Sequence, residues 1–174
     1  MDKTPAEQIL YYAYGSNLHP ERLGARIPSS QLMGVAELSG YQLLFHKRGA
    51  DQSAKCNALY SGNPEHILLG SLFSMAVHEK PILDEIEGAG YVVAEVIVNY
   101  SGSRYPAFMY VAEQDYIDDS LLPYQWYKEF VYLGARYMGF PDHYVSRLAE
   151  VEAIADADAE RHALNERVLN LMRE

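Results

Sequence analysis

The sequence predicts an α+β domain in which a strand-rich body carries helices mainly at its C-terminal end. About six short segments rich in β-branched and aromatic residues occupy the first two thirds of the chain. Turn clusters such as Ser61-Gly62-Asn63-Pro64 separate them. In the last third, apolar residues recur at helical spacing. A length of 174 residues is usual for one domain, so we expect a single domain over 1–174.

The first predicted strand spans 8–14 and stops at Gly15, as a buried strand running into a turn does. A short helix should follow, because Pro20 and Glu21 suit the first helical turn and Asn17 or His19 could cap it. The remaining predicted strands lie around 35–45, 57–60, 67–77, 91–100 and 105–112.

The predicted helices can be placed from their apolar spacing. One short helix ends at Gly88, with Ile82 and Ile86 on its buried face. Another spans 124–138, and Asp142 caps the next. A final helix from about 159 to 174 is a candidate for a peripheral element. Its expected apolar stripe could pack on the domain or on a second copy and consists of Leu164, Val168, Leu171 and Met172.

Composition and charge exclude several classes of protein. The formal charge of −10 and pI near 5.0 disfavour nucleic-acid binding, and we interpret the basic cluster His46-Lys47-Arg48 with Lys55 as a solvated loop. No apolar run is long enough for a membrane helix. The N-terminus lacks the pattern of a secretory leader, and Cys56 has no second cysteine to pair with. A cytoplasmic protein is therefore expected.

Common catalytic and cofactor motifs are missing from the sequence. Neither a phosphate-binding loop nor a dinucleotide fingerprint surrounds any glycine cluster. The six histidines never fall at the close spacing of a helical metal pair, and one cysteine cannot form a thiolate cluster. Ser16 lacks the second glycine of a nucleophile elbow. We expect no metal and no cofactor.

The junction Tyr14-Gly15-Ser16-Asn17-Leu18 is the first candidate for chemistry. Backbone amides before a helix can bind an anion or a developing oxyanion, and glycine permits a ligand to approach closely. Side chains of Ser16 and Asn17 add hydrogen-bonding groups. Taken alone, the same residues favour a capped turn over a binding loop.

The second candidate is Glu87, which lies in Leu83-Asp84-Glu85-Ile86-Glu87-Gly88. Three acids crowd the C-terminal end of a predicted helix, where the helix dipole and neighbouring carboxylates should raise a carboxyl pKa. A raised pKa suits a general base that works near neutrality. Asp84 and Glu85 are expected to face solvent, whereas Glu87, beside the chain reversal, can turn into a cleft.

These two motifs, in this order and spacing, resemble the γ-glutamylcyclotransferase family and its plant AIG2-like relatives. The resemblance rests on Tyr11-Tyr12-Ala13-Tyr14-Gly15-Ser16-Asn17-Leu18 and on the acidic motif ending at Gly88. It continues through 91–96, 127–135 and 139–148, and so spans nearly the whole chain.

The resemblance implies a small, strongly curved mixed sheet or barrel with flanking helices and a cavity beside the glycine loop. By the same resemblance, the backbone of residues 14–18 binds a γ-glutamyl group and Glu87 is the catalytic acid/base. Pocket aromatics fall on Tyr91, Tyr110 and Tyr127. The implied partner is a small γ-glutamyl substrate.

In the implied reaction, the substrate's α-amine attacks its own γ-carbonyl, releasing 5-oxoproline and a free amino acid or amine. The leaving group stays open: γ-glutamylamines or glutathione are alternatives, although Asn17-Leu18 differs from the loop of glutathione-specific relatives. A non-catalytic module that binds a small metabolite is a further alternative. Either a monomer or a homodimer through the C-terminal helix is compatible with the sequence.

Overall fold

The computed structural model describes residues 6–174. Residues 1–5, on which the expectation about a leader partly rests, lie outside the described residues. The strands are β1 (Gln8–Ala13), β2 (Gln31–Ser39), β3 (Tyr41–Arg48), β4 (Ala54–Tyr60), β5 (Ile67–Ala76), β6 (Tyr91–Tyr100) and β7 (Ser103–Ala112). The helices are α1 (Pro20–Arg26), α2 (Lys80–Glu87), α3 (Gln125–Tyr137), α4 (Asp142–Glu150) and α5 (Ala159–Arg173).

Five strands form a closed barrel in the order β1-β5-β2-β6-β7. Neighbouring strands pair antiparallel except where β1 meets β7, a parallel pairing of Tyr11 with Phe108 that closes the barrel. A separate hairpin consists of β3 and β4. The predicted α+β class, with a curved mixed sheet and flanking helices, is confirmed.

The single strand predicted over 35–45 is wrong, because the chain reverses within it. Gly40 adopts a φ of +87°, which glycine reaches without steric cost, and this turn separates β2 from β3. The dipeptide Ser39-Gly40 is a turn signal that the prediction overlooked.

Successive residues of β1 point to opposite faces of the sheet and so reach two separate cores. Tyr12 and Tyr14 belong to the main core, which α3, α4 and α5 cover. Tyr11 and Ala13 belong to a second core, which α1 and α2 cover. Leu23 of α1 and Leu83 of α2 are fully buried there. This arrangement sets both helices beside the C-terminal end of β1.

In α2 the predicted buried face is wrong. Ile82 and Ile86 are 47% and 38% exposed, and Leu83 makes the buried contact instead. One further cap also differs, since Pro141 precedes α4 as its N-cap and Asp142 is its first residue. The predicted cap His19 of α1 is confirmed, because its Nδ1 accepts from the amide of Glu21 at 3.2 Å.

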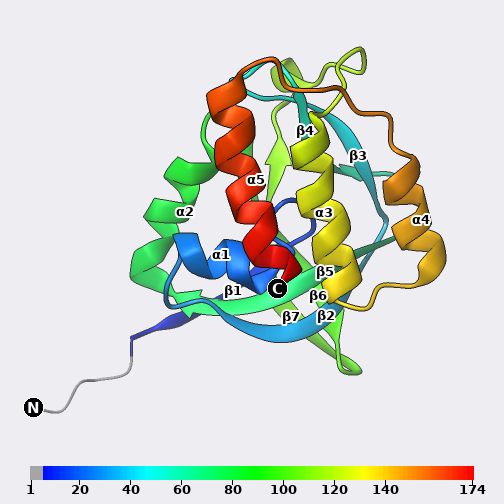
Figure 1. Ribbon diagram of the computed structural model, residues 1–174. Helices are drawn as coiled ribbons and strands as arrows, with labels where there is room; N and C mark the ends of the chain where they lie inside the picture. Colours follow the sequence, from blue (N-terminus) through cyan, green and yellow to red (C-terminus); the bar gives the residue numbers. More distant parts are fainter. Residues whose placement is uncertain (1–5) are drawn as a thin grey trace, which may run out of the picture.

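Helix α5 packs beside α3 and above α1 (Figure 1). Its predicted stripe is wrong in part: Leu164 and Leu171 are exposed, whereas Leu169 and Met172 are buried in the main core. The buried face of α5 is rotated from the predicted stripe because α5 contacts both α3 and α1. Among residues 6–174, no helix combines the length and apolar character needed to cross a membrane.

Candidate active site at the junction of β1 and α1

The loop between β1 and α1 forms a tight turn. The amide of Leu18 donates to the carbonyl of Gly15 at 3.2 Å. In the part of the chain that the structure describes, the amides of Ser16 and Asn17 meet no protein acceptor. Both N–H groups are thus free to donate to a bound anion or oxyanion.

Gly15 is required by a close approach of the backbone to β4. A Cβ at this position would lie 2.9 Å from Cβ of Cys56, closer than real atoms pack. Leu18, at the other end of the loop, is fully buried and faces α3, where a Cβ on Gly134 would lie 2.5 Å from it. Leu18 therefore anchors the loop in the core and does not line the cavity beside it.

Glu87 is the last residue of α2 and lies directly before Gly88, whose φ of +74° ends the helix. Its Oε1 accepts a hydrogen bond from Nδ2 of Asn17 at 2.8 Å. The same Nδ2 donates to the hydroxyl of Tyr11 at 3.2 Å, and Oδ1 of Asn17 accepts from Arg26 at 3.4 Å. Within residues 6–174, Oε2 of Glu87 has no hydrogen-bond partner and is available to a substrate.

Burial raises the pKa of Glu87, while the positive charges of Arg26, Arg22 and Lys47 and the hydrogen bond from Asn17 act in the opposite direction. The predicted direction is confirmed, but its cause is different. Burial exceeds the electrostatic effects, and the expected contribution of neighbouring acids is not among the causes. Asp84 and Glu85 are exposed, as expected.

Four tyrosines named in the sequence analysis surround the carboxyl group of Glu87. Tyr14 donates to the backbone carbonyl of Tyr110 at 2.5 Å, and Tyr91 donates to the carbonyl of Cys56 at 2.5 Å. The hydroxyl of Tyr127 accepts from the amide of Cys56 at 2.9 Å. These contacts fix the rings.

Tyr110 reaches outward from the same group, where its hydroxyl donates to Oδ1 of Asp84 at 2.5 Å. Although partial burial acts to raise it, hydrogen bonds from Lys80 and Tyr110 hold the pKa of Asp84 below its usual value. Asp84 is therefore a carboxylate that positions Tyr110.

An inner cavity of about 30 Å³ lies at the centre of this arrangement. Its lining brings together eight of the nine predicted site residues: Tyr14, Gly15, Ser16, Asn17, Glu87, Tyr91, Tyr110 and Tyr127. Leu18 is the exception. Sequence reasoning missed Tyr11 and Cys56, which also line it. Tyr11 sits three residues before Tyr14, on the opposite face of β1, and the loop bends back over it.

An outer chamber of about 590 Å³ adjoins the inner cavity, and the two share Ser16, Glu87, Tyr91 and Tyr127 as lining. Basic residues that sequence reasoning did not assign to the site line this chamber: Arg22, Arg26, Lys47, Arg48 and Lys55. Spacing offered one signal, since Arg22 and Arg26 are four residues apart on a helix that follows the loop.

Interpreting the basic cluster as a solvated loop is wrong. His46 and Lys47 belong to β3 and are buried. The register of β3 shifts between Phe45 and Lys47, which turns two consecutive side chains inward. Nζ of Lys47 donates to the carbonyl of Ala89 at 2.8 Å and lies 4.4 Å from the ring centroid of Tyr91.

A larger cavity of about 700 Å³ lies elsewhere, among β3, β5 and α4, and shares no lining residue with either site cavity. Its lining contains neither the loop nor Glu87. Over residues 6–174, no group of three or more His, Cys, Asp or Glu side chains is arranged to hold a metal ion.

Comparison with known proteins connects this geometry to one family. Residues 67–148 match the model of the AIG2-like family. The chain is 31% identical to human gamma-glutamylcyclotransferase over 156 residues, which cover 84% of this chain and 80% of the relative. The mouse protein of the same name is 30% identical over 152 residues, with the same coverage.

Solved structures give the same relationship. A gamma-glutamyl cyclotransferase structure superposes with a TM-score of 0.78 at 26% identity, over 92% of this chain and 99% of that one. The match therefore extends over most of the chain.

Proposed function

The chain belongs to the γ-glutamylcyclotransferase family, and from this premise we propose that it cleaves a γ-glutamyl amide by intramolecular attack of the substrate's α-amine. The products are 5-oxoproline and a free amino acid or amine. The observation that carries the proposal is Glu87, a partly buried carboxyl with a raised pKa and a free oxygen, beside two backbone amides that are unpaired among residues 6–174.

Glu87 acts as the proton carrier in this proposal. A substrate α-amine is largely an ammonium at neutral pH, so a base must remove a proton before nitrogen can attack. Oε2 takes that proton and later delivers one to the departing amine. Asn17 holds Oε1, so the carboxyl keeps one orientation through both steps.

The loop binds an anionic oxygen of the substrate. Free amides of Ser16 and Asn17 precede α1 and can donate to a carboxylate or to the oxygen of the γ-carbonyl as charge develops there. Ring closure itself benefits from being intramolecular, which can contribute as much as several kcal/mol. Rigid tyrosines support this by holding the substrate folded on itself.

Release of 5-oxoproline tests the proposal directly. Purified protein is incubated with γ-glutamyl-alanine, and 5-oxoproline is measured by mass spectrometry. We expect turnover in the parent protein and a loss of about 10² to 10⁴-fold in Glu87→Gln, the usual contribution of proton transfer. The matched control is Glu85→Gln on the exposed face of the same helix.

Binding separates an enzyme from a metabolite-binding module on the same fold. Calorimetry with the dipeptide should give similar affinities for the parent protein and for Glu87→Gln. Binding without any 5-oxoproline from the parent protein would favour the module, and undiminished turnover by Glu87→Gln would remove that residue from the mechanism.

We place the reaction in the cytoplasm. Support comes from Cys56, which is the only cysteine in the sequence and remains a buried free thiol.

A further inference from the structure

The leaving part of the substrate must occupy the outer chamber, given the proposed function. Glu87 lines both cavities, so the scissile bond lies at their junction. The inner cavity, at about 30 Å³, is far smaller than the outer chamber, at about 590 Å³, so the larger and variable part of the substrate is assigned to the outer chamber. Whatever lines the outer chamber therefore selects the leaving group.

The outer chamber is strongly positive in a protein whose formal charge is −10. Five basic side chains line it against two acidic ones, Asp51 and Glu87, an excess of three positive charges. Such an excess on a concave surface concentrates anions. The positive chamber contrasts with the rest of the molecule, which carries the net negative charge of the protein.

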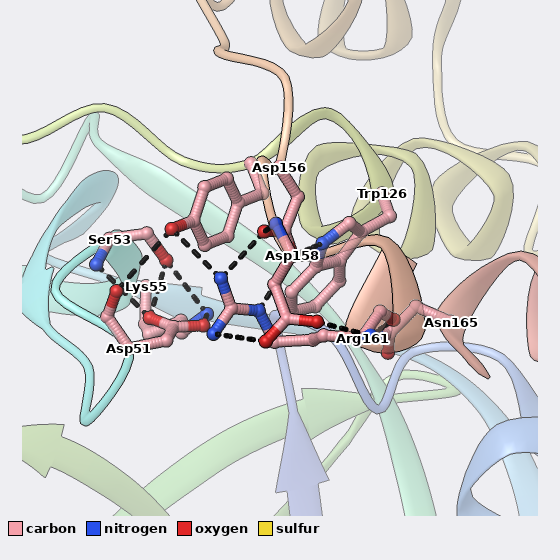
Figure 2. Close-up of polar contacts among 9 residues, drawn as sticks. Asp51, Ser53, Lys55, Trp126, Asp156, Asp158, Arg161 and Asn165 are labelled. Carbon is pink, nitrogen blue, oxygen red and sulfur yellow. Dashed lines mark hydrogen bonds and ion pairs between the residues drawn. The ribbon is translucent and has the colours of Figure 1, made fainter. Parts of the chain in front are cut away.

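One of these cations is already neutralised within the protein. Nζ of Lys55 donates to Asp51 at 2.9 Å and to Oγ of Ser53 at 3.0 Å, on the left of Figure 2. Both side chains are largely buried. This pair is structural, and it leaves Arg22, Arg26, Lys47 and Arg48 facing the chamber.

The adjacent network in Figure 2 holds α5 against the chamber. Arg161 donates to both oxygens of Asp156 at 2.6 Å, and Nε1 of Trp126 donates to Asp156 at 2.9 Å. Nδ2 of Asn165, one turn later, donates to the carbonyl of Arg161 at 2.8 Å. Asn165 and Trp126 both line the chamber, so this network fixes part of its shape.

Arg22 is a buried cation that the protein leaves without an anion. It is 7% exposed, lies 3.7 Å from the ring centroid of Phe130, and makes no side-chain hydrogen bond or ion pair to any residue between 6 and 174. Burial lowers its pKa to about 9, so the guanidinium stays charged at neutral pH. An uncompensated buried charge is costly unless a ligand supplies the partner.

The remaining three cations also lack a carboxylate partner within 4 Å among the described residues. Within residues 6–174, the side-chain hydrogen bond of Arg26 goes to Oδ1 of Asn17 at 3.4 Å, and Arg48 donates to the backbone carbonyl of Asp115 at 3.2 Å. Glu87 can balance one of the four charges, and the substrate's own α-carboxylate can balance another. Two remain.

We infer that the outer chamber binds a leaving group with two carboxylates, so that the preferred substrates are γ-glutamyl derivatives of acidic amino acids. Neutral amines leave the two remaining cations unsatisfied, and an amino acid with a single carboxylate satisfies one. Guanidinium groups suit this role because their planar donors match a carboxylate in two-point contact.

The test compares three ligands that differ in the charge of the leaving group: γ-glutamyl-glutamate, γ-glutamyl-alanine and γ-glutamyl-ethylamide. Calorimetry on Glu87→Gln gives dissociation constants without turnover. We expect affinity to fall in that order, by about tenfold per carboxylate lost, a factor typical of charged hydrogen bonds. The preference should weaken with added salt.

Charge removal in the chamber provides the second arm. Adding Arg48→Gln should reduce the ratio of affinities for the glutamate and ethylamide ligands by about tenfold, because Arg48 is only partly buried and its loss should leave the fold intact. Arg104→Gln, exposed on β7 and outside the chamber lining, should keep the ratio. Arg22→Met, checked by circular dichroism, should reduce it as well.

The two proposals fail differently. Equal affinities for all three ligands, or a ratio unchanged by Arg48→Gln, would overturn the acidic leaving group even if 5-oxoproline is formed. Absence of 5-oxoproline from every γ-glutamyl ligand would overturn the proposed reaction, while the affinity ratios would still decide the charge preference of the chamber.

Discussion

Nδ2 of Asn17 lies 2.8 Å from Oε1 of Glu87 and joins two residues that are 70 positions apart in the chain. This contact connects the loop after β1 to the end of α2. Arg26 binds the other end of the same amide, so the donor orientation of Nδ2 is fixed. The geometry therefore couples the charge state of Glu87 to its neighbours on α1, and it can be tested.

On the acid side of its pH profile, the activity of the parent protein should fall at a higher pH than it would with an ordinary glutamate as base. Burial raises the pKa of Glu87 above 4.5, so the base is protonated, and turnover falls, as pH decreases through that raised value. The measurement is kcat/KM against pH for 5-oxoproline release. A limb at or below 4.5 would contradict the burial of this carboxyl.

Asn17→Asp should move the acid limb further upward. The change replaces a hydrogen-bond donor with a second carboxylate next to Glu87, and both effects raise the pKa of Glu87. We expect lower activity near neutrality and partial recovery at higher pH. Asn99→Asp, which adds the same charge at an exposed position on β6, should leave the profile where it is.

Glu87→Gln should stabilise the protein at neutral pH. Because the folded-state pKa is raised, this group favours folding below its unfolded pKa, and that contribution is lost as pH rises through the folded value. Glutamine imitates the protonated form at every pH. Urea midpoints should thus be higher for Glu87→Gln at pH 8 and converge with the parent protein at pH 4.

A lower urea midpoint for Glu87→Gln than for the parent protein at pH 8 would contradict this prediction. It would mean that the nearby arginines stabilise the charged form of Glu87 more than burial destabilises it. Glu85→Gln is the control for this comparison. It removes one charge from the exposed side of α2 without touching the cavity, so its midpoint difference from the parent protein should not depend strongly on pH between 6 and 8.

Gly15→Ala should destabilise the fold by about 1–3 kcal/mol, the usual cost of overpacking. The added methyl would lie 2.9 Å from Cβ of Cys56. Gly24→Ala in α1 is a matched control, because a Cβ there meets nothing within 4 Å and should stabilise the helix by about 1 kcal/mol. Chemical denaturation measures both, and equal effects would show that the loop can move away from β4.

Cys56 should resist thiol reagents in the native protein. Burial raises the pKa of this thiol to about 12, so very little thiolate exists at pH 8. A disulfide reagent should react slowly with the folded chain and rapidly in urea. Fast modification under native conditions would indicate that the strand carrying Cys56 opens, and with it one side of the inner cavity.

The loop and Glu87 could be predicted because their chemistry is local in sequence. A glycine directly after a strand, and an acid directly before a helix-ending glycine, leave a visible pattern. The role of Leu18 could not be predicted in this way. Its burial depends on Gly134 in α3, and that contact exists only once the helix lies across the loop.

The positive chamber was missed for a similar reason. Lys47 faces inward because β3 shifts its register by one residue, and no periodic pattern reports such a shift. Arg22 and Arg26 were on a predicted helix, but their direction depends on how α1 packs onto β1. Likewise, the buried face of α2 followed the position of the barrel, not the spacing of Ile82 and Ile86.

The ion pair between Arg161 and Asp156, which holds α5 beside the chamber, bears on the order in which parts of the site are synthesised. The loop and Glu87 are synthesised within the first 87 residues, and β7 completes the barrel strands at Ala112. Asn165, which completes the chamber, is translated more than fifty residues after that strand. A nascent chain can thus contain the proposed proton carrier before it contains the surface proposed to select the leaving group.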